Sequence, residues 1–313
     1  MMPEVVSILL LGGTGFIGRH ICQAMNAADI GGFAASFQPD TQFLQAYSPN
    51  IKPTQVGSTE MRNVIAKATH IIYLAHRSRP SSVEKGMRGE IESNVLQLAD
   101  FLKHKRDINP NAPFIYASSG GQIYGQVDKH PILENTSPLP VTDYGMGKLL
   151  NETMLEYEQR TFGMKCTILR LANPVGRWQL SGSHGFVSAV VKRAIAGKTV
   201  TLYGDGHNDR DYFDADDLGE FIVHHCLNDT WVPGIFNIGS GIARNEKQVL
   251  AEVGHIVGRD VHVVNHNARE FDLNYAVLNP SQAQKILGWT SKTSFVDTVK
   301  KLISAVQATA GTS

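Results

Sequence analysis

Residues 5–18, VVSILLLGGTGFIG, decide the fold class of this chain. An apolar run at 5–11 leads into a loop of the form G-x-x-G-x-x-G at 12–18, and an amphipathic segment follows at 16–28. A buried strand, a glycine-rich turn and a helix in this order are typical of nucleotide-binding parallel sheets. Glycine lets the backbone approach a pyrophosphate, and the helix N-terminus offers it free N–H groups. The segment therefore predicts a dinucleotide site.

The first half of the chain continues to alternate short apolar runs with amphipathic segments, which predicts a parallel sheet with helices on both faces. Further strands are expected at residues 32–37, 70–75, 114–118 and 165–171. One helix is expected at 143–160. Another is expected around an apolar stripe with helical spacing, formed by Ile91, Val95, Leu98 and Leu102.

The second half of the chain has a different sequence pattern, and its C-terminal part is more helical. An apolar segment at 235–238 is flanked by glycines and could return to the first sheet. We expect an α/β fold, a Rossmann-type doubly wound parallel sheet with a smaller mixed C-terminal domain. The sheet domain is predicted to comprise residues 1–172 and 211–240 and to bind the dinucleotide. Residues 173–210 and 241–313 are predicted to bind the substrate.

Composition narrows the possible partners. The 29 basic and 29 acidic residues cancel, so the chain lacks the basic excess that nucleic acid or an anionic membrane surface would require. The longest apolar stretch is far below the about 20 residues of a membrane helix. Three widely spaced cysteines form neither a disulfide framework nor a metal pair, which favours a reducing cytoplasm. No metal site is expected, and Asp214, Asp216 and Asp217 are expected to cap a helix.

A second signal is the pair Tyr144 and Lys148, four residues apart on one predicted helix, so that both side chains share a face. An ammonium beside a phenol favours the phenolate, and Lys148 is therefore expected to lower the pKa of Tyr144, as a general base requires. Ser118 and Ser119 follow an apolar run, at the carboxyl end of a strand where parallel sheets bind ligands.

A series of segments in one order resembles the extended short-chain dehydrogenases/reductases of the NAD-dependent epimerase/dehydratase family. The order is nearest to that of its nucleotide-sugar 4-epimerases. Besides the loop at 12–18, the segments are ESNV at 92–95, SSGGQIYG at 118–125, YGMGK at 144–148, RLANPVG at 170–176, YGDG at 203–206, RDYFDADDL at 210–218 and KILGW at 285–289.

The resemblance implies a mechanism. Tyr144 would take the proton of a sugar hydroxyl while the cofactor accepts hydride from the same carbon, and Ser119 would hydrogen-bond that hydroxyl. Lys148 would hold the cofactor ribose and keep the phenolate accessible. In the epimerases the 4-keto intermediate then rotates and takes the hydride back on its other face.

The resemblance also implies the binding residues and the assembly. The expected cofactor site is formed by Gly12, Thr14, Gly15, Phe16, Ile17, Gly18, Ser36, Ser58, Leu74, Ala75, Asn94, Tyr144, Lys148 and Ala172. A nucleotide sugar, UDP-linked, would contact Ser119, Asn173, Tyr203, Arg210 and Arg269, with the two arginines clamping the diphosphate. Relatives commonly form homodimers through the helices equivalent to 90–104 and 144–160, and the same is expected here.

Two departures from the family concern the cofactor. NAD-specific relatives place an acid at the end of the second strand to bind the ribose 2′-OH, whereas this chain has Ser36 there. Ser58 stands where another acid is often found near the adenine. NAD is favoured, but no carboxylate would repel a 2′-phosphate, so NADP stays an alternative. Arg19 is the one nearby basic residue in the sequence.

Two further departures concern the chemistry. The catalytic hydroxyl falls on Ser119 when counted back from Tyr144 and on Gly120 when counted back from Tyr124. Ser119 is favoured because glycine has no hydroxyl, and Ser118 stays open. Dehydratases of the family have an Asp-Glu pair just after this hydroxyl, where this chain has glycines and Gln122, so elimination of water is disfavoured.

Three functions remain at this point. The first is a nucleotide-sugar epimerase that works through a 4-keto intermediate with tightly bound NAD(P). The second is an NAD(P)H-dependent reductase of keto-sugars or other carbonyls on the same fold, which Ser36 favours. The third is a non-enzymatic NAD(P)-sensing protein, against which the intact Tyr144 and Lys148 argue.

Overall fold

A seven-stranded parallel sheet forms the centre of the computed structural model, which describes residues 6–79, 86–128, 130–179, 185–269 and 271–310. The strand order is β3-β2-β1-β4-β5-β6-β10, so the chain starts in the middle and winds outward in both directions. The strands are β1 (Ser7–Leu11), β2 (Gly31–Ser36), β3 (Ile51–Gln55), β4 (His70–Tyr73), β5 (Phe114–Ser119), β6 (Cys166–Leu171) and β10 (Gly234–Ile238). The predicted fold class is confirmed, and β10 returns to the sheet beside β6 as expected.

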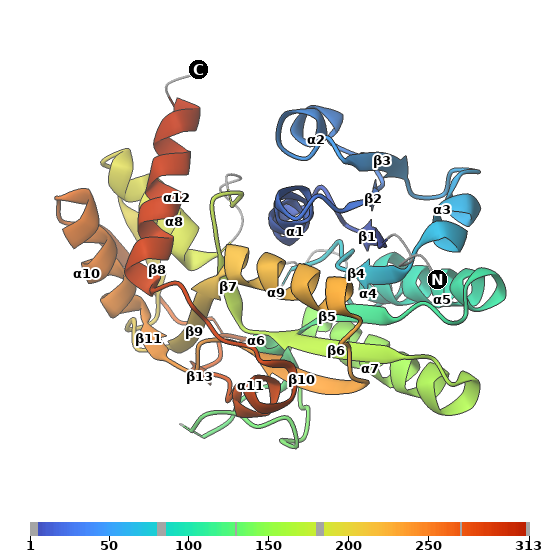
Figure 1. The fold of residues 1–313 in the computed structure, drawn as a ribbon. Coiled ribbons are helices and arrows are strands. Elements are labelled where there is room, and N and C mark those ends of the chain that lie inside the picture. Colours follow the sequence, from blue (N-terminus) through green and yellow to red (C-terminus); the bar gives the residue numbers. More distant parts are fainter. Residues whose placement is uncertain (1–5, 80–85, 129, 180–184, 270, 311–313) are drawn as a thin grey trace.

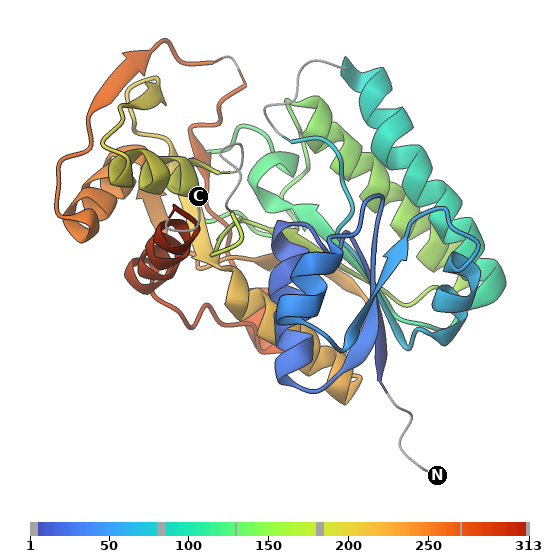
Figure 2. The ribbon, with the colours of Figure 1, turned by 90° about the horizontal axis from the view of Figure 1, so that it is seen from above.

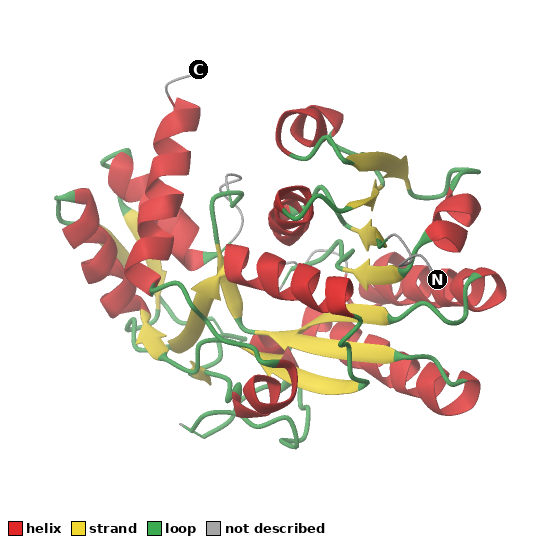
Figure 3. Ribbon diagram, viewed as in Figure 1, coloured by secondary structure: helices red, strands yellow, loops and turns green. Residues whose placement is uncertain are grey.

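Helices cover both faces of this sheet (Figures 1 and 3). One face packs on α1 (Phe16–Ala27), α2 (Thr41–Tyr47), α9 (Ala215–Asn228) and α11 (Ser281–Leu287). The other face packs on α3 (Met61–Lys67), α5 (Leu96–Ile108) and α7 (Asp143–Phe162). Both interfaces are built from buried aliphatic and aromatic side chains, and the burial of such apolar surface is the main favourable contribution to folding.

The helix predicted around the stripe from Ile91 to Leu102 is broken into three parts. These are α4 (Gly86–Glu90), a π-helical turn η1 (Ile91–Val95) and α5. The π turn inserts one extra residue, so the stripe loses its register: Leu98 and Leu102 are buried, but Ile91 is only half-buried. Asn94 is turned inward instead.

A smaller mixed domain lies beside the carboxyl edge of the sheet (Figure 2). Its strands are β7 (Asn173–Val175), β8 (Val200–Tyr203), β9 (Asp209–Asp214), β11 (Ala243–Asn245), β12 (Val263–His266) and β13 (Tyr275–Ala276). Its helices are α8 (Phe186–Ile195), α10 (Glu246–Val257) and α12 (Phe295–Ala310), and the short α6 (Gly120–Ile123) follows β5 in the larger domain. A separate apolar core unites the three long helices.

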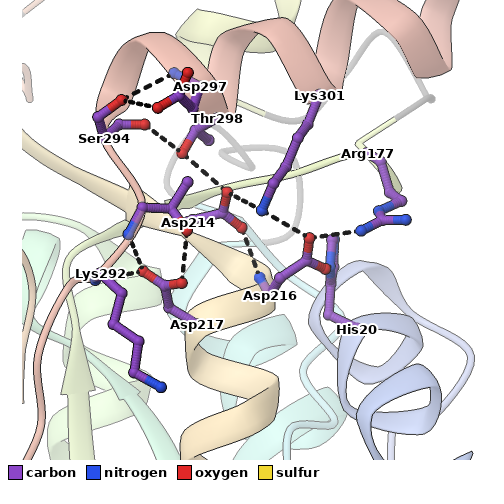
Figure 4. Close-up of polar contacts among 11 residues, drawn as sticks. His20, Arg177, Asp214, Asp216, Asp217, Lys292, Ser294, Asp297, Thr298 and Lys301 are labelled. Carbon is purple, nitrogen blue, oxygen red and sulfur yellow. Dashed lines mark hydrogen bonds and ion pairs between the residues drawn. The ribbon is translucent and has the colours of Figure 1, made fainter. Parts of the chain in front are cut away.

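A polar cluster at the start of α9 ties the two domains together (Figure 4). Asp214 caps α9 by accepting the backbone N–H of Asp216 at 2.8 Å, and it also accepts a bond from Lys301 of α12 at 2.9 Å. The predicted capping role is confirmed for Asp214, whereas Asp216 and Asp217 lie in the first turn of α9 and bond to groups outside that helix. The Asp216 carboxylate accepts bonds from His20 of α1 at 2.6 Å and from Arg177 at 2.7 Å. Burial alone would raise the pKa of Asp216, but these bonds outweigh it and hold the pKa well below its usual range.

Within the described residues, no helix is long and apolar enough to span a membrane.

Candidate active site

The carboxyl edge of the large sheet opens into a cavity of about 350 Å³ at the N-terminus of α1. It brings together residues that lie up to 162 positions apart in the sequence, from Gly12 to Pro174. The predicted site residues that line it are Gly12, Gly15, Phe16, Ile17, Gly18, Leu74, Ala75, Ser118, Ser119, Tyr144, Lys148 and Ala172. The cavity also has lining residues that were not among the predicted site residues, namely His76, Ser78, Arg79, Ala117, Leu171 and Pro174.

The glycine loop has the shape that a pyrophosphate requires. Gly15 precedes α1 with no side-chain cap and no acidic residue in the first turn, so the first N–H groups of the helix are free to bind an anion. A Cβ at Gly18 would overlap the backbone of Gly12 and Gly13. Glycine at position 18 therefore allows the first turn of α1 to pack close to the loop. A Cβ at Gly15 would approach only the Gly12 oxygen, at 3.2 Å, so glycine at position 15 leaves space on the cavity side.

Ser36 at the end of β2 supports the loop rather than lining the cavity. Its hydroxyl accepts a hydrogen bond from the Thr14 hydroxyl at 3.0 Å and a longer one from the Thr14 N–H at 3.4 Å. Arg19 donates to Asp40 at 2.5 Å, so its charge is already paired. Ser58, after β3, also lies outside the cavity lining.

Asn94 acts on the loop after β4 instead of lining the cavity. Its side-chain oxygen accepts the N–H of Arg77 at 2.7 Å, and its amide donates to Ser78 at 3.3 Å. The π turn described above is what aims this buried side chain at the loop. Asn94 therefore orders the segment that borders the cavity.

Tyr144, Ser119 and Lys148 meet at the inner wall of the cavity. The Tyr144 phenol is hydrogen-bonded to Ser119, whereas the buried Ser118 hydroxyl has no partner among the described residues. Lys148 is buried and donates to the Ala117 carbonyl at 2.8 Å, with its Nζ 5.8 Å from the centre of the Tyr144 ring. This arrangement can bind a substrate hydroxyl between the tyrosine and the serine.

The expected lowering of the Tyr144 pKa is wrong for this arrangement. Burial raises the pKa of Tyr144 to about 12, although the hydrogen bond to Ser119 acts in the opposite direction. Burial also lowers the pKa of Lys148 to about 7, despite the negative charges of Glu90 and Glu152. Desolvation disfavours the charged form of both groups. It exceeds the effect of the Ser119 hydrogen bond on Tyr144 and the effect of the Glu90 and Glu152 charges on Lys148.

A second cavity of about 160 Å³ adjoins the first, and Pro174 lines both. It collects the four remaining predicted substrate residues, which come from separate elements: Asn173, Tyr203, Arg210 and Arg269. Glu246 and Asp272 also line it, and neither was predicted from the sequence.

The two arginines of this second cavity differ in their hydrogen-bond partners within the protein. Arg269 forms a two-bond fork with Asp272, at 2.9 and 2.7 Å, and its guanidinium lies over the rings of Tyr203 and Phe271. Among the described residues, the Arg210 guanidinium donates to its neighbour's backbone, the Asp209 carbonyl, at 3.0 Å. The Arg210 guanidinium therefore has more donors left for an anionic ligand.

Comparison with known proteins agrees with this geometry. The chain matches the model of the NAD dependent epimerase/dehydratase family over residues 8–239. It belongs to that family. A dTDP-4-dehydro-6-deoxyglucose reductase of Escherichia coli is 25% identical, and the match covers 96% of this chain and 97% of the reductase. A putative UDP-glucose 4-epimerase of Methanocaldococcus jannaschii is 26% identical, with 95% and 97% covered.

A solved structure of another family member is similar over nearly the whole chain. The UDP-glucose 4-epimerase of Thermotoga maritima, determined with UDP-glucose, superposes with a TM-score of 0.87 at 26% identity, covering 97% of this chain and all of that chain. The similarity of the fold thus extends beyond the residues matched by the family model, over 97% of this chain.

The family segment RLANPVG has a structural as well as a site role. Arg170 is buried and forms an ion pair with Glu152 of α7 at 2.6 Å, and it donates to the Tyr124 hydroxyl at 2.9 Å. These bonds fix β6 against the helix that carries Tyr144. The same segment then places Asn173 in the second cavity.

Proposed function

We propose that this chain is a nucleotide-sugar 4-epimerase that uses a bound NAD, with a UDP-linked sugar as substrate. The observation that carries the proposal is the contact between the two cavities. The first cavity is lined by the glycine loop, which can bind a pyrophosphate, and by Ser119, Tyr144 and Lys148. The second cavity is lined by Arg210, which can bind a diphosphate. A sugar linked to a diphosphate in the second cavity would reach Tyr144 in the first.

The chain's own residues would perform the following steps. Tyr144 accepts the proton of the C4 hydroxyl, and Ser119 holds that hydroxyl by a hydrogen bond. Lys148 binds the ribose of the dinucleotide and supplies positive charge near the phenol. The dinucleotide, when bound, supplies a reversible hydride acceptor. Tyr144 then returns the proton after the keto-sugar has presented its other face.

The absence of a carboxyl group next to Ser119 supports epimerisation over elimination of water. Gly120, Gly121 and Gln122 form the short helix α6 directly after Ser119. A Cβ at Gly120 would overlap Leu278, so this position has no room for a side chain. Gln122 accepts a bond from Thr142 at 3.3 Å and carries no ionisable group. Elimination needs an acid and a base at this point.

The proposed function is tested by incubating the purified chain with UDP-glucose and, separately, UDP-galactose. The expected result is interconversion of the two C4 epimers to one equilibrium ratio from either side, with no net change in reduced-dinucleotide absorbance. Net consumption of one dinucleotide per product would instead establish a reductase or dehydrogenase. No turnover with several nucleotide sugars, together with retained dinucleotide binding, would favour the sensing function.

A reductase of keto-sugars is the second candidate, and two observations favour it. The full-length relative from Escherichia coli is a dTDP-4-dehydro-6-deoxyglucose reductase. In addition, Ser36 at the end of β2 gives the dinucleotide ribose no carboxylate, so a 2′-phosphate would meet no repulsion. A 4-keto-sugar with NADPH is the assay that detects this activity.

The Tyr144 pKa gives a first prediction. Without ligand, the phenolate of Tyr144 is expected only near pH 12, because burial raises its pKa. The positive charge of the nicotinamide ring in oxidised NAD should favour the phenolate and shift this ionisation to lower pH. The difference in phenolate absorbance between wild type and Tyr144→Phe, titrated with and without NAD, measures the shift. An unchanged midpoint would mean that the dinucleotide does not approach Tyr144.

Ser36 gives a second prediction. Ser36→Asp should raise the preference for NAD over NADP, because an aspartate accepts bonds from the ribose 2′-OH and repels a 2′-phosphate. The measurement is the ratio of the two dissociation constants by calorimetry. Ser36→Ala is the control, since it also removes the bonds to Thr14 but adds no charge. Equal ratios in the two variants would place Ser36 away from the 2′ position.

The second cavity gives a third prediction. Arg210→Ala should weaken UDP-sugar binding by about ten- to a hundred-fold, because a charge-assisted hydrogen bond contributes roughly 1.5–3 kcal/mol. The affinity for NAD should be nearly unchanged. Arg269→Ala should cost less, because Asp272 already engages its guanidinium. Arg88→Ala, which removes an exposed arginine of α4, is the control. Wild-type affinity in Arg210→Ala would exclude this cavity as the diphosphate site.

We also propose the division of the chain and its assembly. Residues 1–172 and 211–240 would bind the dinucleotide, and residues 173–210 and 241–313 would bind the nucleotide sugar. An exposed apolar stripe on α7, formed by Met146, Leu150 and Tyr157, supports a homodimer built on α5 and α7. The absence of disulfides among three buried, reduced cysteines is compatible with a cytoplasmic location.

A further inference from the structure

A histidine that no motif indicated lies in the wall of the dinucleotide cavity. His76 follows β4 in the loop that borders the cavity, and its side chain is only 6% exposed. Its ring meets the Tyr144 ring edge-on, with 4.9 Å between the ring centres. It is thus a buried polar group beside the tyrosine to which we assign proton transfer.

The two ring nitrogens of His76 have different surroundings. Nε2 lies 2.9 Å from Oε1 of Glu90, whose side chain is 2% exposed. Both ring nitrogens are buried without a hydrogen bond of standard geometry among the described residues, so Nε2 has the Glu90 carboxylate as a close neighbour and Nδ1 has no polar partner. A carboxylate next to Nε2 favours the tautomer that carries its proton there, so Nδ1 is left with a lone pair.

Glu90 is held in place independently of His76. Its carboxylate also accepts hydrogen bonds from Ser78 and Asn94. The carboxylate occupies the space beside Gly147, where any Cβ would overlap it. The orientation of the His76 ring is therefore set by α4, η1 and α7 together.

An acceptor that is buried in a cavity wall without a donor is costly unless a ligand supplies that donor. Burial lowers the pKa of His76 to about 4, with a further contribution from the charge of Lys148, so the ring is neutral near pH 7 and can only accept at Nδ1. In a site for a dinucleotide and a sugar, the group that can donate a hydrogen bond to a neutral imidazole nitrogen is a hydroxyl.

We propose that His76 is a ligand-binding residue whose Nδ1 accepts a hydrogen bond from a sugar hydroxyl of a bound ligand, and that Glu90 is the positioning residue that fixes its tautomer. The hydroxyl belongs either to the ribose of the dinucleotide or to the sugar of the nucleotide sugar. This inference rests on the proposed function, since that function brings both ligands to this cavity.

The first test follows His76 directly in the intact wild-type protein with ¹⁵N-labelled histidine. The signal missing in His76→Phe identifies His76. Without ligand, its Nδ1 should show the shift of an unprotonated nitrogen, and it should move toward lower frequency when the hydroxyl binds. Addition of NAD alone and then of UDP-glucose shows which ligand supplies the hydroxyl. In Glu90→Gln, the ligand-free spectrum should show a mixture of tautomers.

The second test measures affinity by calorimetry. His76→Phe keeps the ring against Tyr144 but removes Nδ1, so affinity for one of the two ligands should fall about three- to ten-fold. His104→Phe, at an exposed histidine of α5, should change neither affinity. If His76→Phe does not fold, His76→Leu, which also lacks an acceptor, replaces it both for the assignment of the His76 signal and for calorimetry.

Two failures are distinguishable. If the wild-type protein binds both ligands but the Nδ1 signal does not move, only the role of His76 is overturned. The same holds if His76→Phe binds both ligands with wild-type affinity. A wild-type chain that binds neither NAD nor any UDP-sugar would overturn the proposed function and this inference with it.

Discussion

Replacing Tyr144 with phenylalanine is expected to lower turnover at least about 10²-fold, the lower end of what a positioned general base contributes. The substitution keeps the ring that packs on His76 and removes only the hydroxyl bonded to Ser119. Folding and NAD content should therefore be unchanged. The measurement is kcat for C4 epimerisation at saturating UDP-sugar.

Two further variants sharpen this prediction. Ser119→Ala should lose less turnover than Tyr144→Phe, because Ser119 orients the hydroxyl and does not take its proton. Tyr47→Phe is the matched control, since it removes a hydroxyl from an exposed tyrosine on α2. Turnover of Tyr144→Phe close to that of wild type would contradict the assigned mechanism while leaving the fold assignment intact.

Replacing Gly15 with valine is expected to abolish dinucleotide binding without unfolding the chain. Gly15 has φ −76° and ψ 179°, which a valine can adopt, and its Cβ would meet only the Gly12 oxygen within the protein. The added side chain would instead occupy the space in which the backbone approaches the pyrophosphate. Calorimetric titration with NAD measures the loss.

Two glycine variants separate binding from stability. Gly31→Val introduces the same side chain at the exposed start of β2, where the nearest atom to a Cβ is 3.8 Å away, and should bind NAD normally. Gly18→Ala should lower the unfolding temperature, because its Cβ would overlap the loop backbone. Unchanged NAD affinity in Gly15→Val would show that the pyrophosphate lies elsewhere.

The fold could be predicted from sequence because its signals are local. The run from Ser7 to Leu11 and the glycines after it determine a strand, a turn and a helix N-terminus within a dozen residues. Strand β3 was not predicted, and it contains Pro53, a residue that weakens a strand pattern. The structure explains this exception, since β3 is the edge of the sheet and one of its sides has no partner strand.

The site was predictable only where a motif brings its residues together. Tyr144 and Lys148 share a helix, so their spacing in the sequence already places them on one face. The pair of His76 and Glu90 joins a loop to a helix 14 positions later, and no spacing rule connects them. Their contact further depends on Gly147, which leaves space for the carboxylate.

The protonation states of Tyr144 and Lys148 were the least predictable property of the site. Sequence spacing indicates that Lys148 is near Tyr144, but the pKa of each depends on how deeply the two are buried. In the folded chain Lys148 turns toward the Ala117 carbonyl, and desolvation dominates both groups.

The most direct test of the central claim is the fate of a deuterium label at C4 of UDP-glucose. If the chain removes and returns the same hydride through a 4-keto-sugar, the UDP-galactose formed should retain the deuterium at C4, even when unlabelled NADH is present in the solution. Mass spectrometry and NMR of the product measure this retention. Loss of the label to solvent or to the added dinucleotide would contradict the account.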